Sequence, residues 1–479
     1  MKQQNKLDPY KRLIRFLTVM VLVLVLTGMF IVVWKRYHNW GIVFPFYHKG
    51  YWLMGAFYAF FYFIFMYLMG GMNVGSLRMS NLCLSHGLAA AAANVCIYLE
   101  TVLLSARFVS VLPLTCLTCM DMLVILLWVI FSAKLFRRLF PARIVLLLYQ
   151  EYDPMPFRRK VRMRSDRYII KESFNVDEEW DMVVKKIDDY DTVFLCDIHA
   201  PLRNRLLKYC YAHGIRTYIT PKISDIIIRS SENNHMFDTP LLLAKNEGLT
   251  FDQRLAKRVL DLVVSIIALV ITSPVMLVIA IAIKAYDGGP VFFVQDRCTI
   301  NGKVFKIHKF RSMIENAEKD GEVIPATDDD ARITPVGKII RKTRLDELPQ
   351  FFDILIGNMS VVGPRPERVE HVEKYVEEVP EFTYRMKVKG GLTGYAQIYG
   401  KYNTVPYDKL KLDLFYIENY SLWMDLKLIL MTVKTVLKKD STEGVDIDQT
   451  TGLKEHTEGN EEVERKIQEY TSREESHHE

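Results

Sequence analysis

The sequence predicts a membrane protein with three folded parts: an α-helical four-span bundle, a cytosolic α/β (Rossmann-like) domain, and a mixed α+β domain with a re-entrant membrane helix. Three observations support this prediction. Four long apolar runs fall in the first third of the chain, and short apolar runs alternate with helical periods in the middle. A fifth apolar run is interrupted by a proline and is basic at both ends. At 479 residues, the chain is long enough for several domains.

The first four runs predict a transmembrane bundle over residues 1–135. Each run is long enough to cross the roughly 30 Å hydrocarbon core of a bilayer. Lys and Arg mark the cytoplasmic side of a span. Ten of them lie on the side of the N-terminus and of the segment after the fourth run, against four on the other side. The N-terminus and everything after the bundle are therefore expected in the cytoplasm. The runs cover about 16–34, 51–69, 82–104 and 111–131.

Residues 136–249 show the pattern of a small α/β domain with a parallel sheet. Strands are predicted at ARIVLLLY (142–149), DTVFLCD (191–197) and IRTYITP (215–221), with a helix before the last of them. A dinucleotide-binding version should carry Gly-x-Gly-x-x-Gly after its first strand. The five residues after Tyr149 contain no glycine. Dinucleotide binding is therefore disfavoured, and a docking or regulatory role is expected.

The fifth apolar run, residues 262–283, has an unusual pattern for a spanning helix. Lys257 and Arg258 precede it, Lys284 follows it, and Ser273-Pro274 lies near its middle. Basic residues at both ends place both ends on the cytoplasmic side, and proline kinks a helix. A re-entrant helix over 259–283 that enters, bends and leaves on the same side satisfies both facts. A kinked helix that crosses the membrane is the alternative.

Charge is distributed unevenly along the sequence: the C-terminal residues are acidic, and the rest of the chain is basic. From Asp440 on, thirteen Asp and Glu stand against four Lys and Arg, so residues 441–479 are predicted to be a disordered acidic tail. The net charge of +6 therefore leaves about +15 for the rest of the chain. A basic cytosolic face beside a membrane suits anionic lipid headgroups and phosphorylated substrates. No nucleic-acid recognition module is visible, so nucleic acid is not an expected partner.

Short polar motifs between residues 250 and 440 indicate phosphate chemistry at the bilayer surface. The adjacent acids Asp346 and Glu347 follow Arg341 closely. In Gly363-Pro-Arg-Pro366, the prolines can fix the direction of Arg365, as bidentate phosphate recognition requires. Lys309 belongs to a predicted strand, VFKIHKF (304–310), with its charges on one face, and Arg311 follows this strand directly.

Two further motifs fit the same interpretation. Gly390 to Gln397 forms a glycine-rich loop that can bring backbone N–H groups close to a phosphate. Lys257 and Arg258 stand where the fifth apolar run begins, where they could hold a lipid phosphate or act as ordinary interfacial residues. Any one motif is weak evidence, whereas the whole set in order within about 140 residues is strong.

These motifs resemble the bacterial sugar transferase family, the monotopic phosphoglycosyl transferases. The similarity covers residue 250 to about 439, and the order of the parts resembles the large form of the family. Lys401 departs from it, because arginine often stands at this place in the family. The matching motifs are KRxxD at 257–261, Ser273-Pro274, KFRSM at 309–313, DELPQ at 346–350, GPRP at 363–366 and GLTGxAQ at 391–397.

The resemblance implies an enzyme that transfers a sugar-1-phosphate from a nucleoside diphosphate sugar, usually a UDP-sugar, to polyprenyl (undecaprenyl) phosphate and releases UMP. The product would initiate an exopolysaccharide, capsule or other glycan repeat unit. A bacterial inner-membrane location with a cytoplasmic catalytic domain (250–440), contact with membrane lipids, and a homodimer are also implied. Two alternatives stay open: a glycosyltransferase that releases UDP, and a catalytically inactive membrane scaffold.

The resemblance also implies a role for each candidate residue. Asp346 would be the nucleophile, forming a covalent phosphosugar-aspartate, and Glu347 would bind Mg²⁺, with Asp346 sharing the metal. The basic and amide side chains would bind the substrates, and Ser273 and Pro274 would make the re-entrant break. The substrate-binding candidates are Lys257, Arg258, Lys309, Arg311, Arg341, Arg365 and Gln397.

Overall fold

The computed structural model describes residues 6–151, 153–244, 248–315, 330, 332–400 and 404–436. The predicted acidic tail and Lys401 lie outside these residues. Two compact units divide the chain, Met1–Thr220 and Pro221–Glu479, and each is described by itself. This division is coarser than the four segments expected from the sequence, whose boundaries stay predictions.

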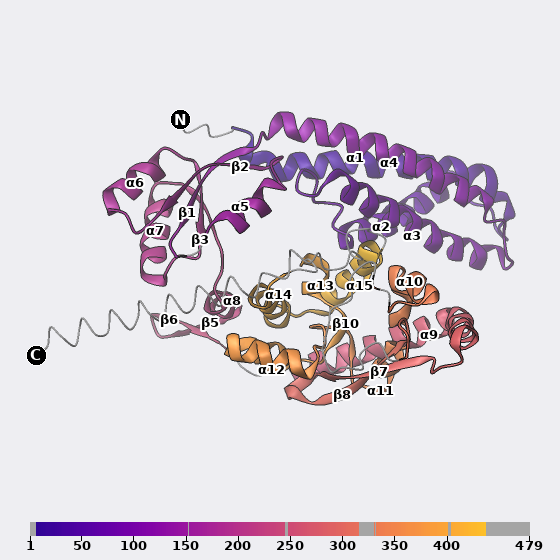
Figure 1. Cartoon of the computed structure of the whole chain (residues 1–479). Helices are drawn as coiled ribbons and strands as arrows, with labels where there is room; N and C mark the ends of the chain where they lie inside the picture. The colour runs from indigo at the N-terminus through magenta and orange to yellow at the C-terminus, as the bar shows by residue number, and fades with distance from the viewer. Residues whose placement is uncertain are drawn as a thin grey trace, which may run out of the picture. The chain divides into compact units, whose positions relative to one another are not determined.

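The first unit begins with four long apolar helices that run side by side (Figure 1). Each is long and apolar enough to cross a membrane. Their interior is filled by large side chains such as Phe30, Tyr58 and Tyr62, which are fully buried, whereas Leu24 and Leu103 are exposed on the outside. Apolar side chains that face outward are what a lipid environment requires. The helices are α1 (Lys11–Val33), α2 (Lys49–Leu68), α3 (Met79–Ser105) and α4 (Leu112–Leu139).

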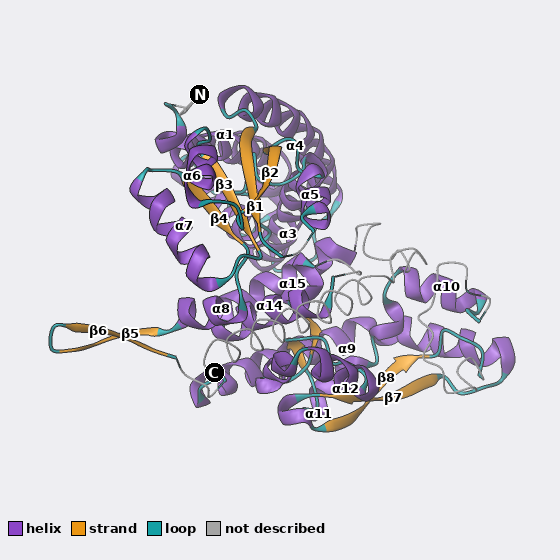
Figure 2. Ribbon diagram, turned by 60° about the vertical axis from the view of Figure 1, so that its left-hand side comes forward, coloured by secondary structure: helices purple, strands orange, loops and turns teal. Residues whose placement is uncertain are grey.

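The rest of the first unit is an α/β domain, which confirms that part of the predicted fold class. Its four strands are all parallel, in the order β2-β1-β3-β4 (Figure 2). The middle of β1 is completely buried, as its unbroken run of aliphatic residues requires. The strands are β1 (Arg143–Tyr149), β2 (Tyr168–Asn175), β3 (Thr192–Cys196) and β4 (Arg216–Ile219), and the helices are α5 (Met155–Arg162), α6 (Trp180–Asp188) and α7 (Ala200–Ala212).

The second unit mixes helices with short two-stranded sheets. β7 pairs with β8 and β5 with β6 in antiparallel fashion, whereas β9 and β10 are parallel. Its strands are β5 (Glu232–Met236), β6 (Thr239–Leu243), β7 (Phe292–Cys298), β8 (Val304–Phe310), β9 (Ser360–Val362) and β10 (Gly391–Thr393). Its helices are α8 (Ile223–Ser230), α9 (Phe251–Asp287), α10 (Pro335–Lys342), α11 (Gln350–Ile356), α12 (Val369–Glu378), α13 (Tyr395–Tyr399), α14 (Pro406–Glu418) and α15 (Leu422–Val436).

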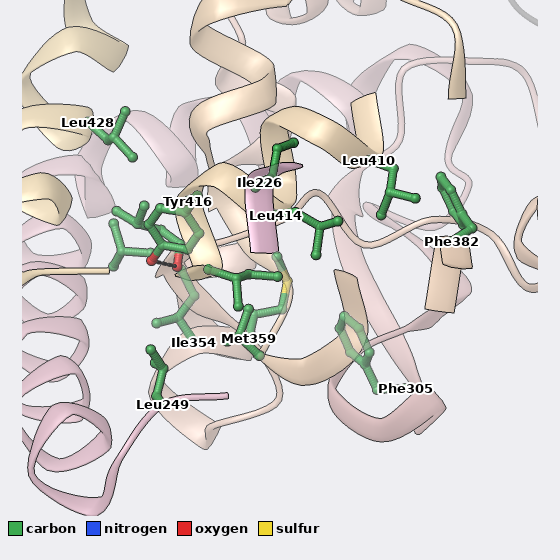
Figure 3. Close-up of a cluster of buried hydrophobic side chains, with 14 of the residues drawn as sticks. Ile226, Leu249, Phe305, Ile354, Met359, Phe382, Leu410, Leu414, Tyr416 and Leu428 are labelled. Atoms are coloured by element: carbon green, nitrogen blue, oxygen red, sulfur yellow. Dashed lines mark hydrogen bonds between the residues drawn. The ribbon is translucent and has the colours of Figure 1, made fainter. Parts of the chain in front are cut away.

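One apolar core joins elements that are far apart in the sequence of this unit (Figure 3). Ile226 of α8 packs with Ile354 of α11, Leu414 of α14 and Leu428 of α15. Met359, which precedes β9, is also completely buried there. Helix α8 therefore belongs to the core of the second unit, although it follows the α/β domain directly in sequence.

Helix α9 runs without interruption through Ser273 and Pro274. Proline has no N–H, so the carbonyl of Val270, four residues earlier, loses its usual helical partner. The hydroxyl of Ser273 donates to this carbonyl at 3.0 Å and compensates for the loss. On the outer surface of α9, apolar side chains such as Ile271 and Val278 are more than 60% exposed. The re-entrant path of this helix stays a prediction.

Candidate active site

The acid pair lies on a single 3₁₀ turn, Leu345–Glu347, between α10 and α11. Thr334 caps α10 by accepting a hydrogen bond from the N–H of Gly337 at 2.9 Å. A side chain at Gly337 would clash with the carbonyl of Ser312, so glycine lets α10 approach the end of β8 closely. After α10, Arg344 adopts a left-handed conformation (φ 57°), which turns the chain into the acid pair.

Three cations from separate elements surround one oxygen of Glu347. Its Oε1 accepts a hydrogen bond from Arg365 at 2.7 Å, and it lies 3.6 Å from Lys309 Nζ and 3.9 Å from Arg344. The Glu347 side chain is only 12% exposed. Burial opposes its ionisation, but Arg365 and Lys309 outweigh burial and hold the pKa of Glu347 well below its usual range. Glu347 is therefore a firmly ionised carboxylate.

Asp346 has the opposite environment. Its Oδ1 is buried and has no hydrogen-bond partner among the described residues. Burial, followed by repulsion from the charge of Glu347, raises the pKa of Asp346 to about 6. Burial also lowers the pKa of the neighbouring Lys309 to about 8. Two adjacent carboxyls whose pKa values are pushed apart are a common feature of catalytic sites, because each can then take a different role.

The loop that carries Arg365 is fixed by backbone contacts. Gly363 donates to the carbonyl of Thr393, and Gly391 donates to the carbonyl of Pro364, both at 2.8 Å. A Cβ on Gly363 would lie 2.4 Å from the carbonyl oxygen of Lys389, so only glycine fits. The rigid loop expected from the GPRP motif is thus held between β9 and β10.

A buried arginine that the sequence interpretation missed supports this loop from behind. Arg385, 3% exposed, donates to the carbonyl of Arg365 at 3.0 Å. The same guanidinium pairs with Asp413 at 2.7 Å and with Glu367 at 3.5 Å. No local signal marks Arg385, because its partners lie up to 28 residues away in sequence.

A second missed residue positions Lys309. The carboxylate of Asp353, fully buried on α11, accepts from the backbone N–H of His308 at 2.9 Å and bonds to its Nδ1 at 2.7 Å. His308 precedes Lys309 on β8, so Asp353 fixes the strand beside the acid pair. The sequence offered one signal: Asp353 lies one helical turn beyond the DELPQ motif.

Arg297 and Arg341 are two further basic residues near the acid pair. Arg297, on β7, donates to the carbonyl of Pro366 at 3.2 Å, while its Nε is buried without a partner among the described residues. Burial and the nearby Arg365 lower the pKa of Arg297 to about 10. Arg341, in the last turn of α10, acts electrostatically on Asp346. Arg297 was not among the candidate residues predicted from the sequence.

Four predicted substrate-binding residues contact protein groups other than the acid pair. Lys257 is buried and pairs with Asp425 of α15 at 2.6 Å. Gln397 donates to the carbonyl of Leu392 at 3.0 Å.

The other two of these residues are arginines. Arg258 donates to the carbonyls of Ile354 and Leu355, each at 2.7 Å, and so caps the end of α11. Arg311 forms an ion pair with Asp287 at the end of α9. A role of these four residues in substrate binding stays a prediction.

The donor set at the acid pair is compatible with a Mg²⁺ ion that also binds substrate. The described residues contain no group of three or more His, Cys, Asp or Glu side chains placed to hold a metal. Mg²⁺ typically takes one or two carboxylates and completes its shell with phosphate oxygens and water. The unpartnered Oδ1 of Asp346 and the adjacent Glu347 carboxylate fit this partial set.

Comparison with known proteins gives consistent results. The model of the bacterial sugar transferase family matches residues 252–439. The "UDP-N-acetylgalactosamine-undecaprenyl-phosphate N-acetylgalactosaminephosphotransferase" of Aeromonas hydrophila is 34% identical over 314 residues, covering 65% of this chain and 70% of that protein. The "UDP-glucose:undecaprenyl-phosphate glucose-1-phosphate transferase" of Klebsiella pneumoniae is 46% identical over 203 residues, covering 41% of this chain and 42% of that protein.

A shorter relative matches over nearly its whole length. The "Uncharacterized sugar transferase EpsL" of Bacillus subtilis is 38% identical over 200 residues, which is 41% of this chain but 96% of that protein. The chain thus spans less than half of the Klebsiella relative and nearly all of the Bacillus one.

Proposed function

Since this chain belongs to the bacterial sugar transferase family, we propose that it transfers a sugar-1-phosphate from a UDP-sugar to undecaprenyl phosphate and releases UMP. The observation that carries this proposal is the acid pair, Asp346 and Glu347, with Lys309 and Arg365 paired to Glu347. Cations that gather at Glu347, next to the carboxylate of Asp346, suit a substrate with two linked phosphates. The printed names of two relatives describe transfer of this kind to undecaprenyl phosphate.

In the first step, Asp346 acts as the nucleophile. A carboxylate oxygen attacks the phosphorus that bears the sugar, a new P–O bond forms, and the bond to UMP breaks with its electron pair leaving on UMP. No described residue donates a hydrogen bond to Oδ1 of Asp346, so no protein donor ties up this carboxylate oxygen. A pKa of about 6 leaves most of Asp346 ionised at neutral pH.

In the second step, an oxygen of polyprenyl phosphate attacks the same phosphorus and releases the carboxylate of Asp346. The covalent intermediate means that the two anionic substrates need not meet directly, which removes one repulsive encounter. Arg365 and Lys309 would stabilise the charge that develops on the phosphoryl oxygens. Arg341, on α10, would also contribute.

A Mg²⁺ ion would be held by Asp346 and Glu347. When bound, it would neutralise charge on the diphosphate oxygens. Glu347 also orders Arg365 and Lys309, so it keeps the cations aligned before substrate arrives.

The nucleotide product tests the reaction class. Purified full-length protein is incubated with polyprenyl phosphate and a panel of UDP-sugars, and the released nucleotide is identified. We expect UMP with one sugar or a few. Release of UDP would instead indicate a glycosyltransferase that moves the bare sugar, and no nucleotide with any sugar would favour an inactive scaffold.

For the membrane, we propose a multi-pass protein of the bacterial inner membrane whose catalytic domain faces the cytoplasm. Helix α9 would be re-entrant over 259–283, since soluble UDP-sugar must reach the acid pair that follows it. The product would start an exopolysaccharide, capsule or other glycan repeat unit, and the enzyme would work as a homodimer.

Cysteine labelling tests the path of α9. In a variant without other reactive cysteines, Asp287→Cys is treated in intact cells with a membrane-impermeant reagent. We expect labelling only after lysis. Labelling in intact cells would mean that α9 crosses the membrane and that the re-entrant path is wrong.

A further inference from the structure

The helix α5 of the α/β domain is held against the end of the bundle predicted to face the cytoplasm (Figure 1). Just after α5, Arg164 donates to the carbonyl of Ser76, in the connection between α2 and α3, at 2.7 Å. Arg78, from the same connection, donates to the carbonyl of Met163. Arg15 of α1 donates to the hydroxyl of Ser76 at 3.2 Å. The C-terminal end of α5 and the beginning of α1 therefore both lie next to Ser76.

Helix α5 is amphipathic, and its apolar side is already occupied. Phe157 and Val161 pack against the sheet, and the ring of Phe157 lies edge-on to Phe194, 5.7 Å between centroids. On the other side, Arg159 and Arg162 are exposed. Between residues 155 and 167 the sequence contains six Lys and Arg but one acid. This outer side therefore suits an anionic partner.

The neighbouring helix ends of the bundle add charge of the same sign. Arg12, near the start of α1, and Arg137 and Arg138, in the last turn of α4, are all exposed. Two nearby acids are already engaged, because Asp8 pairs with Arg143 and Asp166 pairs with Arg164. Like charges therefore gather here in excess, and an external anion would relieve their repulsion.

We propose that α5 and the adjoining helix ends bind the anionic phospholipid headgroups of the cytoplasmic leaflet. Ser76 lies in the short connection between α2 and α3, two helices that are predicted to span the membrane. The contacts to Ser76 therefore place α5 at the depth of the lipid headgroups. Met155 and Met163, both about half exposed, flank the basic side and can reach the upper part of the acyl region. A cluster of exposed cations at this depth matches a charged lipid surface. The α/β domain would thus be oriented by the membrane, whatever the sugar or the reaction mechanism.

Hydrogen exchange of the full-length protein in lipid nanodiscs tests this proposal. Exchange of the peptide covering residues 155–168 is compared between phosphatidylcholine alone and phosphatidylcholine with phosphatidylglycerol. We expect slower exchange with phosphatidylglycerol, and the effect should disappear near 1 M salt, where the screening length is about 3 Å. In Arg159→Gln/Arg162→Gln, the equilibrium constant for headgroup binding, obtained from the dependence of exchange on phosphatidylglycerol content, should fall by roughly thirtyfold, about fivefold for each charge.

A matched variant removes the same charge elsewhere in the domain. Lys171→Gln/Lys208→Gln changes two exposed lysines on β2 and α7, and it should respond to phosphatidylglycerol like the wild type. Unchanged exchange in β1 and β3 verifies that both variants are folded. Equal exchange of α5 in the two lipids, or equal losses in the two variants, would overturn the proposal. Protection by inorganic phosphate in phosphatidylcholine would indicate a site for free anions and would also overturn it.

Discussion

Replacing Asp346 with asparagine should abolish transfer and, at neutral pH, make the protein more stable. The wild-type carboxyl is buried beside the charge of Glu347, and its pKa rises from 3.8 to about 6. Asparagine has almost the same shape but carries neither the charge nor the nucleophilic oxygen. An amide cannot accept the phosphosugar, so UMP release should fall to background.

The size of the stability gain follows from the pKa difference. A group whose pKa is raised by folding stabilises the protein fully below its unfolded value, here 3.8, and this contribution is lost as the pH rises through about 6. At pH 8 the wild type has therefore lost the stability that corresponds to a shift of about two pKa units. This free energy of unfolding is about 3 kcal/mol as an upper bound. Remaining solvent access reduces the expected gain to about 1–3 kcal/mol. The variant should match the wild type near pH 4 and exceed it above pH 6.

Thermal unfolding of the full-length protein in detergent measures this effect. A domain of this size changes its Tm by roughly 2–4 °C per kcal/mol, so the two Tm curves should separate by about 5 °C at pH 8 and converge at low pH. Asp296→Asn, at an exposed carboxylate on β7, is the matched control and should change neither Tm nor activity. A constant Tm difference at all pH values, or a less stable Asp346→Asn at pH 8, would refute the reasoning. Appreciable turnover by this variant would refute the covalent step.

Five further outcomes are expected. Glu347→Gln should lower activity at least about a hundredfold, and excess EDTA should stop UMP release; full activity without divalent metal would remove Mg²⁺ from the proposal. The kcat/KM of the wild type should fall about tenfold per pH unit below about 6, as Asp346 becomes protonated. Arg385→Lys keeps the buried charge but cannot reach all of its partners, so kcat should fall about tenfold or more at nearly constant KM. Fragments starting at Pro221 and at Thr250 both retain the acid pair, but only the first retains α8 and its two core isoleucines. Since each contributes about 1.5–3 kcal/mol, the shorter fragment should unfold at clearly lower temperature in detergent, and equal Tm values would contradict this role of α8.

Much of the fold was predictable because the relevant signals are local. A bilayer span requires a long apolar run, and a buried parallel strand requires a short one, so the four N-terminal helices and the strand β1 could be recognised from composition alone. The core position of α8 could not be recognised in this way. Ile223 and Ile226 pack against residues more than a hundred positions later in the chain, and no local pattern encodes such a partner.

At the candidate site, the sequence alone predicted which residues would carry the chemistry. Asp346, Glu347 and Arg365 stand in short motifs whose spacing limits their geometry. Only the tertiary structure decided how the charges pair. It places Arg365 and Lys309 on Glu347, leaves Oδ1 of Asp346 without a partner, and pairs Lys257 with Asp425, 168 residues away. The physical reason is that ionisation and reactivity depend on distance and burial, and both are set by contacts between elements remote in the chain.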